Sequence, residues 1–149
     1  MKLEDEIKQS KFSSEYQKFI LNIMFSGVWL HAQHAQLLKP FDISVQQLNV
    51  LRILRGQNGK AITIGRIQER MFDKMSNASR LVTKLLDKQL ISRNSCKEDK
   101  RQAEILIAEK GIKLLEQLDK ILKNHELSFN HLNETEAKEL NRLLDKLRD

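Results

Sequence analysis

The sequence predicts a mainly α-helical protein that carries one small β-hairpin. Among its 149 residues only one Pro and five Gly interrupt helical patterns, and residue types that favour helices, such as Leu, Lys, Glu and Gln, are frequent. The hairpin is predicted by a change to alternating apolar and polar residues on either side of a charged segment. A chain of this length is expected to form a single domain, residues 1–149.

The first two helices are predicted from apolar periodicity and from the signals that stop and start it. Residues 13–39 carry apolar side chains near helical spacing, and Pro40 ends the pattern because it lacks the backbone N–H that a helix interior needs. Ser44 and Gln47 then form the S-x-x-Q pattern of a capping box, which marks the start of a second helix. This helix is expected to end near Gly56.

A helix-turn-helix pattern follows. Thr63 is expected to cap a short helix that runs to about Arg70, and a break occurs at Phe72 and Asp73. The next predicted helix, Lys74 to Lys88, has one polar and basic face and one apolar face that consists of Met75, Ala78, Leu81, Val82, Leu85 and Leu86. A short helix, a tight break and a second helix with a basic face indicate a DNA-binding unit whose second helix enters the major groove.

After this helix the hydrophobic period changes from 3.6 to 2. Residues 91–95 and 103–108 are predicted to pair as strands, and the charged segment Lys97 to Arg101 forms the tip between them. A hairpin that follows a helix-turn-helix is a wing. The sequence therefore predicts a winged helix-turn-helix unit over residues 44–108.

Further helices are predicted over residues 109–147. Asn133 and Glu136 form a capping box before the last of them, whose apolar stripe consists of Leu140, Leu143, Leu144 and Leu147. Together with the helix at 13–39, these helices have more apolar surface than one small core covers. We therefore expect residues 13–39 and 109–147 to be dimerisation helices of a homodimer.

Positive charge is concentrated on the predicted winged unit. The chain has a net charge of +6, and residues 74–101 contribute +5 of it, from eight basic and three acidic residues. Localised positive charge of this kind indicates double-stranded DNA as the partner. Arg80 is expected to read a base edge, while Lys84 and Lys88 are expected beside phosphates. The predicted DNA contacts are Ser76, Asn77, Ser79, Arg80, Thr83, Lys84, Lys88, Lys97, Asp99, Lys100 and Arg101.

The stretch from Ala61 to Gly111 resembles the MarR (multiple-antibiotic-resistance regulator) family of bacterial winged-helix transcription factors. Ser76 to Lys88 is similar to the recognition helix of the family, Asp99-Lys100-Arg101 to its Asp-x-Arg wing tip, and Ile107 to Gly111 to its Leu-Thr-x-x-Gly segment. The resemblance implies a dimer that binds a pseudo-palindromic operator. It also implies a transcriptional repressor that is relieved by a small molecule or another signal.

The wing tip and two departures from the family pattern carry further expectations. Asp99 is expected to orient Arg101 for insertion into the minor groove, as the family's Asp-x-Arg tip also implies. Gln89 stands where the family has Gly, so a left-handed backbone at this position carries a modest strain. Ala108 replaces the usual Thr and removes a helix cap.

Other residues permit a functional and a plainer interpretation. The resemblance implies an amphipathic ligand between the dimer helices and the winged unit, with Trp29 and His34 as candidate pocket walls, whereas core packing is the alternative. We expect Cys96, the only cysteine, to be a bystander rather than a redox switch. Four histidines could bind a metal only if they converged, which their spacing does not show, so no metal site is predicted: His31, His34, His125 and His131.

Two alternative functions remain at this stage. One is a ligand-independent architectural DNA-binding dimer, which would bind all sequences equally. The other is a metal-dependent enzyme, which is disfavoured because the sequence has no nucleophile motif and no Gly-rich phosphate loop. The longest apolar stretch, Phe19 to Leu30, is too short for a membrane span, so we expect no membrane contact. We also expect a cytoplasmic protein. No cofactor is expected.

Overall fold

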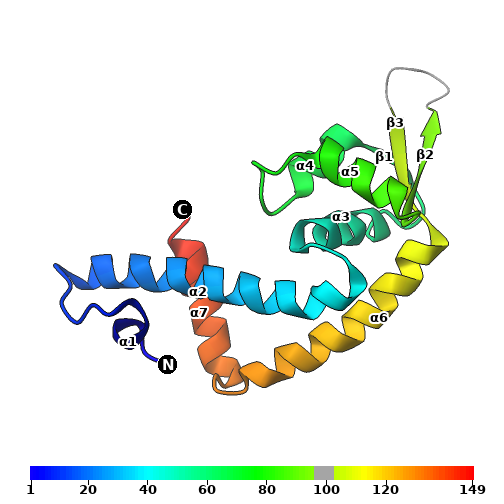
Figure 1. Cartoon of the computed structure of the whole chain (residues 1–149). Helices are drawn as coiled ribbons and strands as arrows, with labels where there is room; N and C mark the ends of the chain where they lie inside the picture. Colours follow the sequence, from blue (N-terminus) through cyan, green and yellow to red (C-terminus); the bar gives the residue numbers. More distant parts are fainter. Residues whose placement is uncertain (96–102) are drawn as a thin grey trace.

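A computed structural model describes residues 1–95 and 103–149 of the chain (Figure 1). The fold is mainly helical with a small antiparallel sheet, as predicted. The elements in chain order are α1 (Leu3–Ile7), α2 (Glu15–Leu38), the 3-10 helix η1 (Lys39–Phe41), α3 (Val45–Arg55), β1 (Ile62–Thr63), α4 (Ile64–Arg70), α5 (Ala78–Asp87), β2 (Ile91–Ser95), β3 (Ala103–Ile107), α6 (Glu109–Glu126), the 3-10 helix η2 (Leu127–Phe129) and α7 (Glu134–Lys146).

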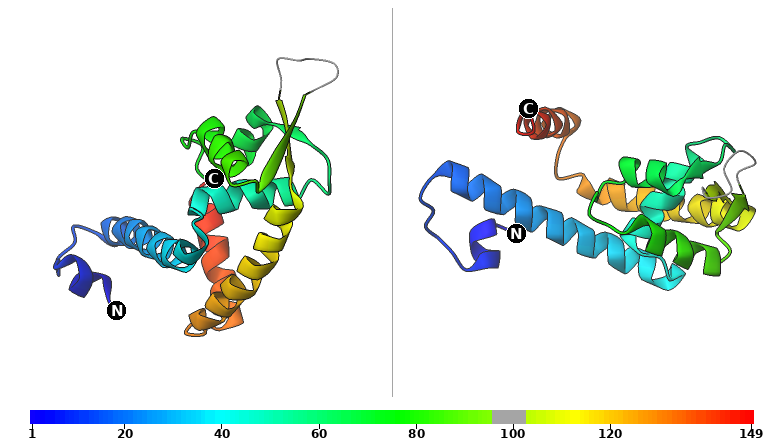
Figure 2. Two further views of the ribbon diagram at one scale, coloured as in Figure 1. Left: turned by 45° about the vertical axis from the view of Figure 1, so that its right-hand side comes forward. Right: turned by 90° about the horizontal axis from the view of Figure 1, so that it is seen from above.

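Two long helices extend from a compact unit of shorter elements. Figures 1 and 2 show α3, α4 and α5 grouped with the hairpin of β2 and β3, while α2 and α6 run away from this group and α7 folds back from the far end of α6. None of the described helices combines the length and the apolar character that crossing a membrane requires.

The predicted capping boxes are confirmed. At the start of α3, the Gln47 N–H donates to Ser44 Oγ (3.1 Å) and the Ser44 N–H donates to Gln47 Oε1 (2.9 Å). At the start of α7, Asn133 and Glu136 exchange the same pair of bonds at 2.8 and 3.0 Å. The first predicted helix is also confirmed, because α2 ends at Leu38 and is followed by η1.

The predicted start of the second helix of the helix-turn-helix is wrong. The periodicity placed it at Lys74, but α5 begins at Ala78, and Met75, which was expected on the apolar face, is 92% exposed. Local hydrogen bonds explain the difference. Asp73 accepts the Met75 N–H (2.9 Å) and the Ser76 hydroxyl (2.6 Å), which holds this segment in a turn.

A short N-terminal helix was missed by the sequence analysis. α1 has five residues, too few to show a helical period, and it lies against the beginning of α2 through an ion pair of Glu4 with Lys18 (2.6 Å). The hydrogen bond that the Lys18 ammonium donates to the Glu4 carboxylate lowers the pKa of Glu4. The side chain of Leu3 is buried in this contact region.

The predicted hairpin is confirmed. β2 and β3 pair antiparallel with Ile91 opposite Ile107, and β1 pairs with the other edge of β3 with Ile62 opposite Ile105. The central strand β3 buries Ile105 completely. The predicted tip lies outside the described residues, and with it the sequence-predicted positions Cys96, Lys97, Asp99, Lys100 and Arg101.

The core lies where α3, α5, β3 and α6 meet. Leu51, Leu85, Ile105 and Leu115, one from each of these elements, have no exposed surface. Burial of an aliphatic side chain of this size contributes about 1.5–3 kcal/mol. This packing fixes the apolar side of α5, so its polar side faces outward.

The end of α5 adopts the left-handed conformation that the sequence suggested. Gln89 has a φ of 59°. The Leu90 N–H donates to the Leu85 carbonyl (3.0 Å) and the Gln89 N–H donates to the Leu86 carbonyl (2.8 Å), which are the two bonds of a Schellman motif. The expected loss of a cap at Ala108 is also confirmed, because its side chain makes no capping bond to α6.

Gly111 brings α6 into direct contact with Leu90, the last residue of this motif. A Cβ atom at Gly111 would lie 2.2 Å from the Leu90 carbonyl oxygen, so a larger residue does not fit without displacement. The same carbonyl accepts the Ala108 N–H (3.1 Å), and Lys110 Nζ donates to the Lys88 carbonyl (2.9 Å). The end of α5, the sheet and α6 therefore meet at one close backbone contact.

We expect Gly111→Ala to lower the free energy of unfolding by about 1–3 kcal/mol, because the new methyl group must displace the Leu90 carbonyl. Gly65→Ala in α4 is the matched control, since its Cβ would approach nothing closer than 3.9 Å. The control should leave stability unchanged or raise it by up to about 1 kcal/mol. Urea unfolding measures both variants, and equal effects would contradict this contact.

Candidate nucleic-acid interface

α5 separates a buried face from an exposed face that carries hydroxyl and cationic groups. Ala78, Val82 and Leu85 are buried. Four of the sequence-predicted DNA contacts share the exposed face: Ser79, Arg80, Thr83 and Lys84. The Thr83 hydroxyl donates to the Ser79 carbonyl (3.0 Å), so this side chain lies along the helix surface.

Ser76 and Asn77 precede α5 rather than lie within it. Asn77 Oδ1 accepts the Arg80 N–H (3.0 Å) and caps the helix. The Ser76 hydroxyl, followed by the Met75 N–H, lowers the pKa of Asp73 by hydrogen bonding to its carboxylate. Both predicted contact residues therefore help to hold the start of α5, next to its exposed face.

Lys88 is engaged at the other end of α5. Its ammonium pairs with Asp42 Oδ2 (2.8 Å) and also donates to the Asp42 carbonyl. The hydrogen bond from Lys88 lowers the pKa of Asp42, and Lys84 adds a weaker attraction. Sequence analysis missed Asp42, because it lies 46 residues from Lys88 and no local pattern connects them. Lys84 differs from Lys88 in being exposed.

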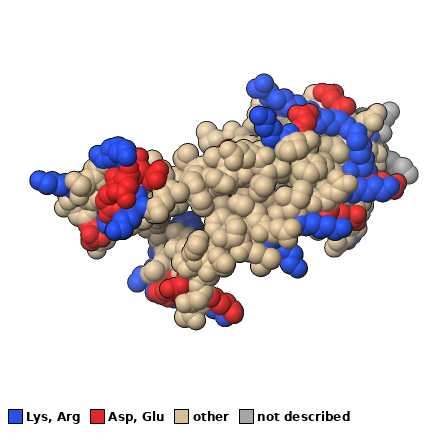
Figure 3. Space-filling view, turned by 60° about the horizontal axis from the view of Figure 1, so that its bottom comes forward, with Lys and Arg blue, Asp and Glu red and all other residues tan. Residues whose placement is uncertain are grey.

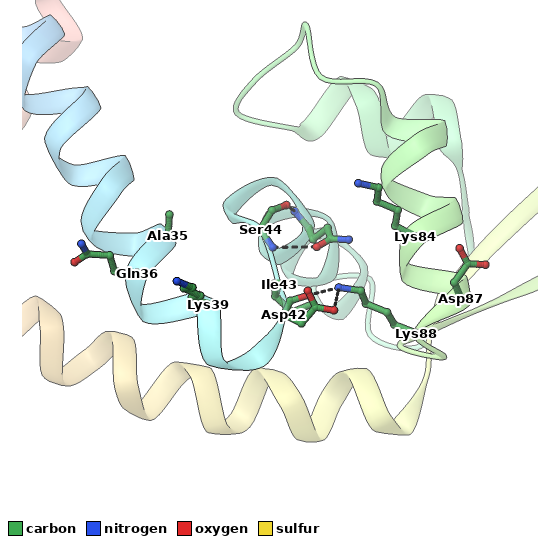
Figure 4. A pocket seen from close by; sticks show the side chains of 10 residues that line it. Ala35, Gln36, Lys39, Asp42, Ile43, Ser44, Lys84, Asp87 and Lys88 are labelled. Atoms are coloured by element: carbon green, nitrogen blue, oxygen red, sulfur yellow. Dashed lines mark hydrogen bonds and ion pairs between the residues drawn. The ribbon is translucent and has the colours of Figure 1, made fainter.

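A cleft of about 770 Å³ lies beside this ion pair, between the end of α2 and α5 (Figure 4). Its walls include three cationic side chains, Lys39, Lys84 and Lys88, and two carboxylates, Asp42 and Asp87. The cleft therefore connects the C-terminal end of α2 with the helix that carries the predicted DNA contacts.

Comparisons with known proteins give a consistent result. A sequence model of the MarR family matches residues 43–103. The HTH-type transcriptional repressor IacR of Pseudomonas putida is 29% identical over 129 residues, which cover 81% of this chain and 76% of IacR. A MarR transcription factor from Planctomyces limnophilus has a TM-score of 0.69 at 29% identity, with 91% of this chain and 98% of that chain covered. The S. aureus MepR–DNA complex has a TM-score of 0.72 at 26% identity, covering 91% and 96%.

Residues 43–103 match the MarR family, and the fold of the chain matches solved MarR-family structures. The chain is a transcriptional regulator, and the alternative of a metal-dependent enzyme is set aside because MarR-family members are transcription factors. In residues 1–95 and 103–149, no three His, Cys, Asp or Glu side chains are grouped as a metal site would require.

The two candidate ligand residues lie on α2 and pack against η2 and the end of α6. The ring of Trp29 meets that of Phe129 edge to face at 5.9 Å, and the rings of His34 and His125 are 5.4 Å apart. Within the described part of the chain, His125 Nδ1 is buried without a hydrogen-bond partner. Neither Trp29 nor His34 lines the cleft beside α5, and their role in ligand binding stays a prediction.

His34 lies in an environment that disfavours its protonated form. Burial is the largest cause that lowers its pKa, followed by repulsion from His125, Arg52 and His31, while Glu126 opposes the shift. Folding therefore favours the neutral imidazole. The resulting stabilisation is fully present above the ordinary pKa of 6.5 and is lost as the pH falls through the lowered value.

We therefore expect the urea midpoint to fall when the pH is lowered from about 7.5 to about 5, and we expect His34→Gln to reduce that fall. His131→Gln, which changes an exposed histidine, is the control and should keep the wild-type pH dependence. The same pH dependence in wild type and in both variants would contradict this role of His34.

Proposed function

We propose that this MarR-family regulator binds a pseudo-palindromic double-stranded DNA operator as a homodimer and represses transcription. α5 enters the major groove, and the wing reaches the adjacent minor groove. The observation that supports this most strongly is the exposed face of α5, on which Arg80 and Lys84 lie with the hydroxyls of Ser79 and Thr83. Figure 1 shows the hairpin beside this helix, so both elements can approach one duplex.

The segment between β2 and β3 adds positive charge in sequence. Lys97, Lys100 and Arg101 belong to the segment that joins β2 to β3 in sequence, and Asp99 stands two positions before Arg101. We assign Arg101 to the minor groove, whose negative potential attracts a guanidinium, and Asp99 to its orientation. Asn77 and Ser76 contact DNA from the start of α5, in addition to the cap that Asn77 forms and the hydrogen bond from Ser76 to Asp73.

The long helices at 13–39 and 109–147 supply the dimer interface in this proposal. No Lys, Arg, Asp or Glu occurs from Phe19 to Leu38. Figure 3 shows a face whose middle is largely free of charged side chains, which gather at its two ends and along its lower edge. Large apolar side chains are exposed on α2, on α7 and directly after α7, namely Ile20, Met24, Val28, Leu140, Leu143 and Leu147. A second copy that covers them removes this surface from water.

Repression and its relief are supported by the relatives and by the cleft. IacR is a transcriptional repressor, and MepR was solved in complex with DNA. We propose that a small molecule or another signal relieves repression here, since the cleft is lined by Lys84 and Lys88 of the DNA-reading helix. The cytoplasm is the proposed location, because a bacterial operator is found there.

We expect Arg80→Ala to weaken binding to the operator by about 1–3 kcal/mol and to reduce discrimination against random duplex DNA. Because Arg80 is exposed, its replacement by Ala should leave the fold intact, and weaker binding then reports the loss of a DNA contact. Arg80→Lys is the charge-matched control, which should restore affinity for random DNA but not full discrimination. Competition binding measures both quantities. Full discrimination by Arg80→Ala would contradict base reading by this residue.

The dimer interface is tested by placing a charge on α7. Leu143→Lys should weaken the dimer at least about tenfold, because a buried unpaired ammonium is costly. Asn141→Lys adds the same charge to the same helix, away from the leucine stripe, and should leave the dimer intact. Analytical ultracentrifugation across a concentration series reports both dissociation constants. A Leu143→Lys dimer as tight as the control would refute the assignment of α7.

A further inference from the structure

The turn between α4 and α5 carries two very exposed apolar side chains. Phe72 is 90% exposed and Met75 is 92% exposed, the highest values among the large apolar side chains of the described residues. Both lie outside α2 and α7, whose apolar side chains a second copy is proposed to cover. The dimer proposal therefore gives no reason for their exposure.

Hydrogen bonds to two neighbouring helices hold this turn in place. The Phe72 N–H donates to Asn49 Oδ1 on α3 at 3.0 Å. From α4, Gln68 Nε2 donates to the Lys74 carbonyl (2.6 Å) and Gln68 Oε1 accepts the Ala78 N–H (3.1 Å). These bonds add to those of the Asp73 carboxylate described above. The backbone that carries the two side chains is therefore fixed before any partner binds, which lowers the entropy lost on binding.

The position and the charge of the turn favour DNA as its partner. Met75 stands two residues before Asn77, the cap of α5, so the turn is continuous with the proposed DNA-contact face. Arg70, Lys74 and Arg80 are exposed around it, and the carboxylate of Asp73 is occupied within the turn. A basic surrounding suits a polyanion better than a neutral apolar protein surface.

We propose that Phe72 and Met75 contact thymine methyl groups in the major groove and thereby make the regulator selective for thymine at those operator positions. The C5-methyl of thymine is the apolar group that base edges present in this groove, and apolar side chains recognise it by direct contact. This inference rests on the proposed function, because it requires α5 to lie in the major groove.

The test removes the methyl group alone. Each thymine of an operator duplex recovered by selection from random DNA is replaced in turn by deoxyuridine, and the affinity of the full-length protein is measured. We expect a loss of about fourfold at one or two thymines, the factor that corresponds to burial of one methyl group. Phe72→Ala or Met75→Ala should abolish the deoxyuridine penalty at its own thymine. Phe72→Leu and Met75→Leu retain an apolar side chain and should keep most of it.

The outcomes separate this inference from the proposed function. Failure of the wild-type protein to select any sequence would contradict the proposed function itself. Selective binding without a deoxyuridine penalty, or with a penalty that both alanine variants retain, would overturn only the contact to thymine. A third outcome would also overturn the contact to thymine. If the alanine variants bind DNA and discriminate thymine like wild type but fail to repress transcription in cells, the turn has a protein partner.

Discussion

The contact between the Leu90 carbonyl and Gly111 fixes the end of α5, the start of β2 and the start of α6 relative to one another. This carbonyl stands between the end of α5 and the beginning of β2, and it accepts the Ala108 N–H where α6 begins. Because close-packed backbone has little room to yield, the recognition helix, the wing and a long helix keep one relative orientation. Leu85 and Leu115 are fully buried in the same core and hold the contact from within. A change in the direction of α6 therefore moves α5 and the hairpin together.

Contacts between residues far apart in the chain complete the candidate site. The sequence alone does not predict these contacts. The Lys88–Asp42 pair joins α5 to the end of η1, and the His34–His125 contact joins α2 to α6. No periodicity or motif connects residues so far apart in the chain. An ion pair at the surface contributes little to stability, because solvent screens it. Packing rather than the Lys88–Asp42 pair therefore fixes α5, and the pair mainly determines where the Lys88 ammonium lies.

Local signals, in contrast, predicted most of the fold. The Ser44 and Asn133 capping boxes are specified by side chains three residues apart, and the hairpin by a change of period, so a short stretch of sequence contains all the information. The prediction failed where two local preferences compete. Met75 fits the helical period of α5, but Asp73 binds the nearby backbone and hydroxyl groups and delays the helix to Ala78. That competition creates the exposed turn next to the recognition helix.

Selection of bound sequences from random duplex DNA is the most direct test of recognition by a homodimer through α5. Two copies related by a two-fold axis present two recognition helices, so we expect a pseudo-palindromic consensus. Its half-sites should be separated by about one helical turn, 10–10.5 base pairs, or a multiple of it. A bound pool without a shared sequence, or a consensus that lacks two-fold symmetry, would contradict this mode of DNA recognition.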